Sequence, residues 1–228
     1  MTDALAMVRV MAWLSPAFPT GGFAYSAGLE TAAHEGLVDG EDTLLHWVSC
    51  QLTQGTLLLD AKLVSLSHRA QTSEVLTELQ SLARALAGSE PRWRETLAQG
   101  DAFLAGIGER REFADMDAKG TLKLSSHQSG CPLAVAIGAA TAHGGVARSI
   151  AIIAFLQSAV GQQLSAAIRL NLMGQSGAAR LLDRLEASIV GTMESALNCT
   201  IDDLTSATPI ADILAARHST LDGRLFLS

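Results

Sequence analysis

Few of the side chains that could do chemistry in this 228-residue chain stand at a useful spacing. Glu30 and His34 are four residues apart and can share a helix face, and the same holds for His127 and Cys131. Each pair supplies only two metal ligands, whereas structural zinc sites use four and catalytic sites about three. Capping, packing or solvation is therefore the favoured role of both pairs.

Sequence motifs that mark catalytic or nucleotide-binding sites are absent. The chain has no G-x-x-x-x-G-K-[ST] loop, no H-E-x-x-H, no C-x-x-C and no G-x-S-x-G. It also lacks the E-x-x-H pair of di-iron helical bundles, and its six histidines are scattered. We therefore expect a protein that is not an enzyme and has no metal or cofactor site of its own.

An apolar loop at 14–30 is the most unusual segment. Pro19 restricts the backbone, while Gly21 and Gly22 allow backbone angles and close approaches that other residues resist. The loop carries no charge until Glu30 and leads into a helix. A loop this apolar is either packed into the fold or kept for a partner.

Two later segments can likewise either pack within the fold or contact a partner. Gln163 and Arg169 interrupt an otherwise apolar helix at 148–170, so they belong either to an internal hydrogen-bond network or to an interface. The tail at 217–228 contains the apolar run Leu225-Phe226-Leu227 near its end. A chain end of this kind would fray in water unless it docks on something. Docking of this tail on its own chain and docking on a partner are equally supported.

The apolar residues recur at helical spacing, with no convincing period-two run. This predicts an all-α, single-domain bundle of about eight to ten helices around a central apolar helix at 148–170, with a polar loop at 114–130. Three leucine-rich stripes are expected at 45–66, 76–86 and 93–107. Predicted helix stops are Gly36, Gly88 and Gly144, and predicted starts are Ser89-Glu90-Pro91, Thr208-Pro209 and a capping box at Thr200–Asp203.

Composition excludes several classes of protein. Hydrophobic residues make up 48% of the chain and charged residues 17%, which favours self-association or a permanent partner. A net charge of −7 without basic runs argues against nucleic-acid binding. The apolar stretch at 150–160 is about half of a membrane span, so no membrane insertion is expected. Three widely spaced cysteines indicate a reducing, cytoplasmic location.

The chain resembles the UreF family of urease accessory proteins over nearly its whole length. The family's S-P-x-x-P-x-G-G-[FY]-x-[YW]-S-x-G-L-E is matched from Ser15 to Glu30, directly after Leu14, its S-A-A-[VI]-[RK]-L from Ser165 to Leu170, and its R-H…R-L-F tail from Arg217 to Phe226. The candidate partner-interface residues are Pro19, Gly21, Gly22, Tyr25, Ser26, Glu30, Gln163, Arg169, Gln175, Arg217, His218, Arg224 and Phe226.

The resemblance implies a cytoplasmic, dimeric chaperone or adaptor for nickel insertion. Its partners would be UreD (UreH in some systems), the GTPase UreG and the urease apoprotein, with nickel and GTP handled by the partners. The tail departs from the family pattern at Ser219 and Leu227, so a diverged, weakly active UreF paralogue is one alternative. An all-helical ligand-binding regulator and a helical hydrolase or metalloenzyme are the others.

Overall fold

The computed structural model of this protein describes residues 3–108 and 130–228. Its α-helices are α1 (Asp3–Trp13), α2 (Leu29–His34), α3 (Glu41–Thr53), α4 (Thr56–Arg69), α5 (Ser73–Ala85), α6 (Glu90–Gly108), α8 (Leu133–His143), α9 (Arg148–Arg169), α10 (Gln175–Leu197) and α11 (Pro209–Arg217). Short 3-10 helices are η1 (Gly22–Ala24), η3 (Ile201–Asp203) and η4 (His218–Thr220). The predicted loop at 114–130 lies, except for Gly130, outside the described residues.

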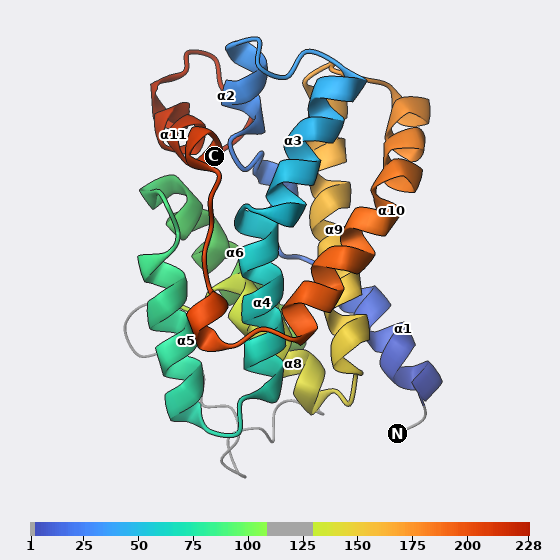
Figure 1. Ribbon diagram of the computed structural model, residues 1–228, viewed down its shortest axis with the longest axis vertical. Coiled ribbons are helices and arrows are strands. Elements are labelled where there is room, and N and C mark those ends of the chain that lie inside the picture. Colours follow the sequence, from blue (N-terminus) through green and yellow to red (C-terminus); the bar gives the residue numbers. More distant parts are fainter. Residues whose placement is uncertain (1–2, 109–129) are drawn as a thin grey trace.

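The predicted all-α fold is confirmed, since no strand occurs in the described ranges. In Figure 1, α3 and α4 follow one another in a column, with α9 and α10 on one side and α5 and α6 on the other. Helices α2 and α11 pack together at one end, close to the C-terminus. One cluster of buried apolar side chains joins these elements and extends from Ala6 in α1 to Phe226 in the tail.

The apolar helix α9 has the central place predicted for it. It packs against α1, α2, α3, α4, α8, α10 and η1, and Gln157 is its one exposed residue. Among the described residues it is also the one helix long and apolar enough to cross a membrane, with 50% of that window buried inside the fold. The core helix of a soluble protein passes the same test, so this is weak evidence for a span.

Helix α8 is buried more completely than α9, and the sequence reasoning did not single it out. Every residue from Ala134 to Thr141 is buried, and the helix packs mainly on α4. Small side chains permit this close approach. A Cβ atom added at Gly138 would overlap the carbonyl oxygen of Val64 and lie 2.8 Å from Cβ of Ser67.

The first leucine-rich stripe, at 45–66, is divided between two helices. Gly55 adopts an extended backbone between α3 and α4. The side-chain oxygen of Gln51 then accepts hydrogen bonds from the backbone N–H of Thr56, at 3.0 Å, and from its hydroxyl, at 3.1 Å. This contact satisfies an otherwise unpaired N–H at the start of α4. One helix can therefore end and the next begin here without interrupting the apolar face.

The predicted helix boundaries agree with the structure. Gly36 follows the C-cap of α2 with a positive φ angle of 72°, as the left-handed end of a helix favours, and Gly88, with a φ angle of 74°, lies three residues beyond the end of α5. Gly144 ends α8, Glu90 begins α6, and Pro209 occupies the first turn of α11. The capping box at Thr200–Asp203 is present around η3.

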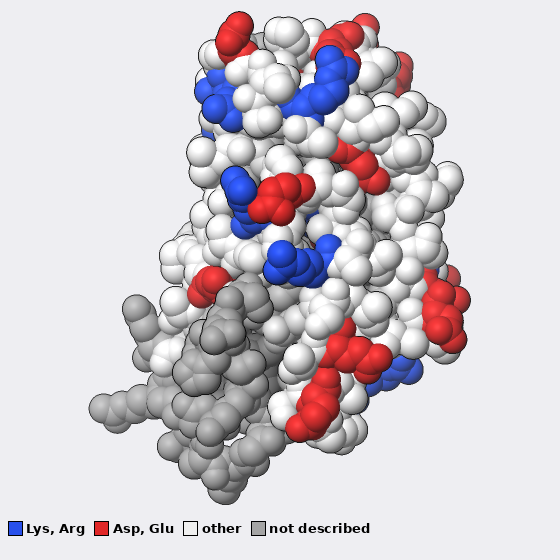
Figure 2. Space-filling model, turned by 90° about the vertical axis from the view of Figure 1, so that its left-hand side faces the viewer, with Lys and Arg blue, Asp and Glu red and all other residues white. Residues whose placement is uncertain are grey.

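Charged side chains are sparse on the face shown in Figure 2. Acidic and basic residues stand in small groups, including a run of adjacent acidic side chains near the lower edge, separated by wide uncharged areas. The described part of this face therefore lacks the basic stripe that phosphate binding requires.

Candidate functional site

The loop and the tail predicted as separate candidates lie side by side. The Leu227 N–H donates to the carbonyl oxygen of Ala24 at 2.8 Å, and the Ser26 N–H donates to that of Ser228 at 2.9 Å. These residues are about two hundred positions apart in the sequence. We call residues 22–30 and 217–228 together the loop–tail junction.

Glu30 is the main anchor of the tail. Its carboxylate lies 2.7 Å from His218 Nε2 and accepts backbone hydrogen bonds from Leu225, at 2.6 Å, and Phe226, at 3.2 Å. His218 is 1% exposed and Glu30 is 7% exposed, so this pairing takes place inside the protein. A buried carboxylate is tolerated when its oxygens are satisfied in this way.

A second anchor holds the end of the tail. The Ser26 hydroxyl donates to the carbonyl oxygen of Ser228 at 2.5 Å, and the Ser228 hydroxyl donates to Glu95 Oε2 at 2.7 Å. Glu95 lies in α6, is 3% exposed, and also accepts from Gln99 at 3.1 Å. The tail thus connects the loop to α6.

Arg169, at the end of α9, contacts the aromatic rings of Phe23 and Phe226 in the junction. Its guanidinium carbon lies 4.0 Å from the centre of the Phe23 ring and 4.1 Å from that of Phe226, and it donates to the Phe23 carbonyl oxygen. Such cation–π contacts favour a fixed arrangement of the rings. Arg169 therefore positions the junction from within its own chain.

Glycines permit the close packing of the junction. Gly28 has a φ angle of 82°, and a Cβ atom there would lie 3.2 Å from the backbone nitrogen of Ala215 in α11. A Cβ atom at Gly22 would lie 2.7 Å from Oε1 of Gln162 in α9. Glycine is thus favoured at Gly28 by its positive φ and by the neighbouring backbone, whereas the contact at Gly22 is with the movable end of a glutamine side chain.

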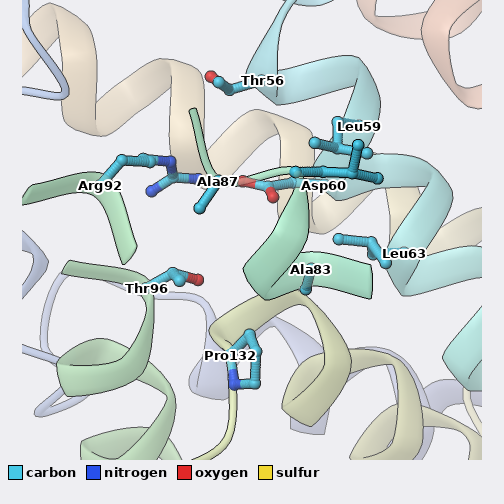
Figure 3. A pocket seen from close by; sticks show the side chains of 10 residues that line it. Thr56, Leu59, Asp60, Leu63, Ala83, Ala87, Arg92, Thr96 and Pro132 are labelled. Atoms are coloured by element: carbon cyan, nitrogen blue, oxygen red, sulfur yellow. Dashed lines mark hydrogen bonds and ion pairs between the residues drawn. The ribbon is translucent and has the colours of Figure 1, made fainter. Parts of the chain in front are cut away.

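A pocket that borders the junction is lined by Tyr25, Ser26, Asp60, Arg92 and Glu95 among others, so it contains more carboxylates than cations. Figure 3 shows an adjoining pocket that shares two of these residues, in which Arg92 of α6 points toward Asp60 of α4, with which it forms an ion pair. Arg92 also lies 3.3 Å from Glu95. Burial raises the pKa of the Asp60 carboxyl, an effect that Arg92 opposes and Glu95 reinforces.

The pKa values of a neighbouring hydroxyl group and a neighbouring carboxyl group are raised as well. Burial, and secondarily the Glu95 carboxylate, raises the pKa of Tyr25, so its phenol stays protonated. Burial raises the pKa of Asp212, although Arg92 opposes this. The Ser228 hydroxyl donates to Glu95 beside this pocket, but both residues are buried and are held by further contacts with Ser26 and Gln99, so the arrangement is that of a structural network. In residues 3–108 and 130–228, no group of three or more histidine, cysteine, aspartate or glutamate side chains could hold a metal ion.

Three large apolar side chains of the junction face outward. Phe23 is 67% exposed, Leu225 60% and Leu227 67%, although their backbones are held by the anchors just described. We call these three residues the tail face. An ordered backbone that presents apolar side chains to solvent is typical of a protein-binding surface.

The predicted interface residues fall into three groups by their exposure to solvent. The exposed ones are Pro19, Gly21, Gln175, Arg217 and Arg224, the partly buried ones are Tyr25 and Arg169, and the buried ones are Gly22, Ser26, Glu30, Gln163, His218 and Phe226. Apart from Gln163, the buried residues support the junction from inside, so their side chains do not face solvent in this structure. Phe226, 4% exposed, is part of the apolar core and is not a free anchor for a partner.

Two predicted residues lie apart from the tail. Gln163 accepts a hydrogen bond from the indole of Trp47 in α3 at 3.2 Å, which favours the internal-network interpretation. Gln175 begins α10, where a Cβ atom at the nearby Gly177 would meet the side chain of Glu41 in α3.

Of the two metal-ligand pairs considered, Glu30 binds His218 instead of His34, and His127 lies outside the described residues.

Sequence reasoning missed Glu95 and Ser228, which complete the second anchor. The available signal for Glu95 was its spacing of three from Arg92 on a helix whose other face is apolar. Nothing in the sequence marks Ser228, because its role depends on where the tail docks.

Comparisons with known proteins agree on one family. Residues 38–186 match the family model UreF. The chain is 43% identical over 234 residues to the urease accessory protein UreF of Allorhizobium ampelinum, covering 99% of this chain and 98% of that one. It is 40% identical over 234 residues to the same-named protein of Mesorhizobium japonicum, with both chains fully covered. With that of Agrobacterium fabrum it shares 43% identity over 224 residues, covering 98% and 96%.

Proposed function

Because the chain belongs to the UreF family of urease accessory proteins, we propose that it acts as an adaptor in nickel insertion. In this role it binds UreD (UreH in some systems), recruits the GTPase UreG, and acts with them on the urease apoprotein in the cytoplasm. The resemblance noted in the sequence supplies these partner identities. The tail face is the observation that supports partner binding, since it presents three exposed apolar side chains on a backbone that is already ordered.

The adaptor is proposed to be non-catalytic and to have no resident cofactor. The pocket beside the loop–tail junction pairs its carboxylates with Arg92 and Ser228, and the hydroxyl–carboxylate contact of Ser228 with Glu95 is buried and held in place by Ser26. GTP hydrolysis and nickel delivery are then functions of the partners. Calorimetric titration of the purified protein with Ni²⁺ is expected to reveal no submicromolar, stoichiometric site, and such a site would contradict the assignment.

Replacing Leu227 with aspartate is expected to weaken UreD binding without unfolding the protein. Leu227 is 67% exposed, and its backbone contact to Ala24 does not depend on its side chain. Loss of one apolar anchor at an interface costs about 2 kcal/mol, or about thirtyfold in affinity. Affinity capture of UreD from a co-expression, followed by a titration, measures the effect.

Val190→Asp is the matched control for Leu227→Asp. Val190 is an exposed valine on α10, 44% exposed and outside the loop–tail junction. It should leave UreD binding unchanged while adding the same charge to the surface. Equal binding by the two variants would show that the tail face is not the UreD site. Loss of UreG recruitment with UreD binding intact would assign the tail face to UreG instead.

Self-association into a homodimer is also expected. Exposed apolar side chains occur on α1 at Leu5, Val8 and Met11 and on α11 at Ile210 and Ile213. Together with the low charged fraction of 17%, they favour a symmetric dimer, the commonest homo-oligomer. Light scattering of the free protein at micromolar concentration should give twice the chain mass, and a monomer mass would contradict this.

A further inference from the structure

Helix α3 carries a histidine and a cysteine that the adaptor role does not use. The Nε2 atom of His46 lies 3.6 Å from Sγ of Cys50. His46 is exposed and Cys50 is partly buried, so solvent reaches the pair. We propose that His46 and Cys50 bind a thiophilic divalent metal ion of the Zn²⁺ class as an exchangeable two-ligand site.

The helix gives the two donor atoms a common direction. Residues four apart lie one above the other on a single helix face. The opposite face of α3 is fixed in the core by Leu44, Val48 and Leu52, each 0% exposed. The backbone that carries the ligands is therefore already ordered before any ion binds, which lowers the entropic cost of binding.

The separation of the donors, which form a hydrogen bond with one another, is compatible with one tetrahedral ion between them. With Zn–S near 2.3 Å and Zn–N near 2.0–2.1 Å, neighbouring ligands are about 3.5–3.6 Å apart at the tetrahedral angle and about 3.1 Å apart at a right angle. The observed 3.6 Å between His46 and Cys50 matches the tetrahedral value. A thiolate and an imidazole are also donor types that Zn²⁺ commonly uses in proteins.

Cys50 is the only one of the three cysteines that can supply such a ligand at neutral pH. Cys131 is 3% exposed and Cys199 is 4% exposed. Burial is the main cause that raises the pKa of both thiols, and it keeps them protonated and unreactive. A thiol-specific measurement on the folded protein therefore reports Cys50 alone.

Two protein ligands leave the remaining coordination positions to water, so the ion exchanges readily. This distinguishes the site from a resident cofactor site, and it does not depend on the adaptor role. Binding converts the Cys50 thiol to a thiolate bound to the metal and releases its proton to solvent, while His46 binds as the neutral imidazole. No electron is transferred, and binding weakens as the pH falls.

The first experiment titrates the metal-free, reduced, full-length protein with Co²⁺ and records the absorption spectrum. A thiolate-to-cobalt charge-transfer band is expected for the natural protein. His46→Asn should weaken binding by more than about tenfold, and Cys50→Ser should abolish the band. His34→Asn and Cys199→Ser are the matched controls and should keep it. A band that persists in Cys50→Ser would overturn the proposal, as would the absence of a band in the natural protein.

The second experiment needs no change at the cysteine. Zn²⁺ should slow alkylation of Cys50 by iodoacetamide in the natural protein, with the modified peptide identified by mass spectrometry. In His46→Asn the thiol is intact, so equal alkylation with and without Zn²⁺ is expected. Equal protection in this variant would show that the two residues do not act as a pair and would overturn the proposal.

Discussion

Replacing Glu30 with alanine is expected to lower the free energy of unfolding by about 3 kcal/mol, because it leaves three hydrogen-bond donors inside the protein without their acceptor. The carboxylate accepts from His218 and from the backbone N–H groups of Leu225 and Phe226. Without it, all three donors lose their acceptor, and the tail leaves the loop to recover hydrogen bonds with water. Urea unfolding followed by circular dichroism measures the loss.

Proteolysis separates release of the tail from global unfolding. Trypsin should cut Glu30→Ala faster at Arg217 and Arg224, while the helical body stays resistant. Glu35→Ala is the matched control, because Glu35 pairs at 2.9 Å with an Arg217 side chain that is 58% exposed, and such pairs contribute about 0–1 kcal/mol. Glu30→Ala protein with natural stability and natural cleavage rates would show that Glu30 does not anchor the tail.

Replacing Gly138 with alanine is expected to destabilise the fold by about 3 kcal/mol or more, at the upper end of overpacking costs. The added methyl group would overlap the Val64 carbonyl oxygen and approach Ser67 and His68 of α4. Backbone atoms cannot move aside as a flexible side chain can, so α4 and α8 must separate. Because both helices lie in the core, the whole unfolding transition should shift to lower temperature.

Gly191→Ala is the same substitution as Gly138→Ala, but it is expected to raise the stability of the protein. Gly191 lies inside α10, and a Cβ atom there meets nothing within 4 Å. Alanine favours the helix over glycine by about 1 kcal/mol, so the variant should be more stable than the natural protein. If both variants shifted the melting temperature in the same direction, the contact between α4 and α8 would not be the cause.

The helical bundle could be predicted because its causes are local. Apolar spacing along the chain reports the buried face of each helix, and residues such as Gly88 and Pro209 mark boundaries through backbone restrictions. The break at Gly55 could not be predicted in this way. It depends on the side chain of Gln51 folding back onto Thr56, which leaves the apolar pattern unchanged on both sides.

The loop–tail junction could be predicted only in its parts. The apolar character of the loop and the tail showed that both need cover, but not that they cover one another. Their contacts, such as Ser26 with Ser228, depend on the path of the whole chain between them. The buried state of Phe226 and the role of Glu95 follow from that path, and spacing within one segment carries no information about it.

The buried position of Ser228 has a practical consequence for handling the protein. Ser228 is 2% exposed, and both its carbonyl oxygen and its hydroxyl are bound inside the fold. An affinity tag or fluorescent protein fused after Ser228 would have to leave from this enclosed position, and would pull the anchors of the tail apart. Asp3, at the start of α1, is exposed, so a fusion ahead of α1 spares the surface that capture experiments are meant to report.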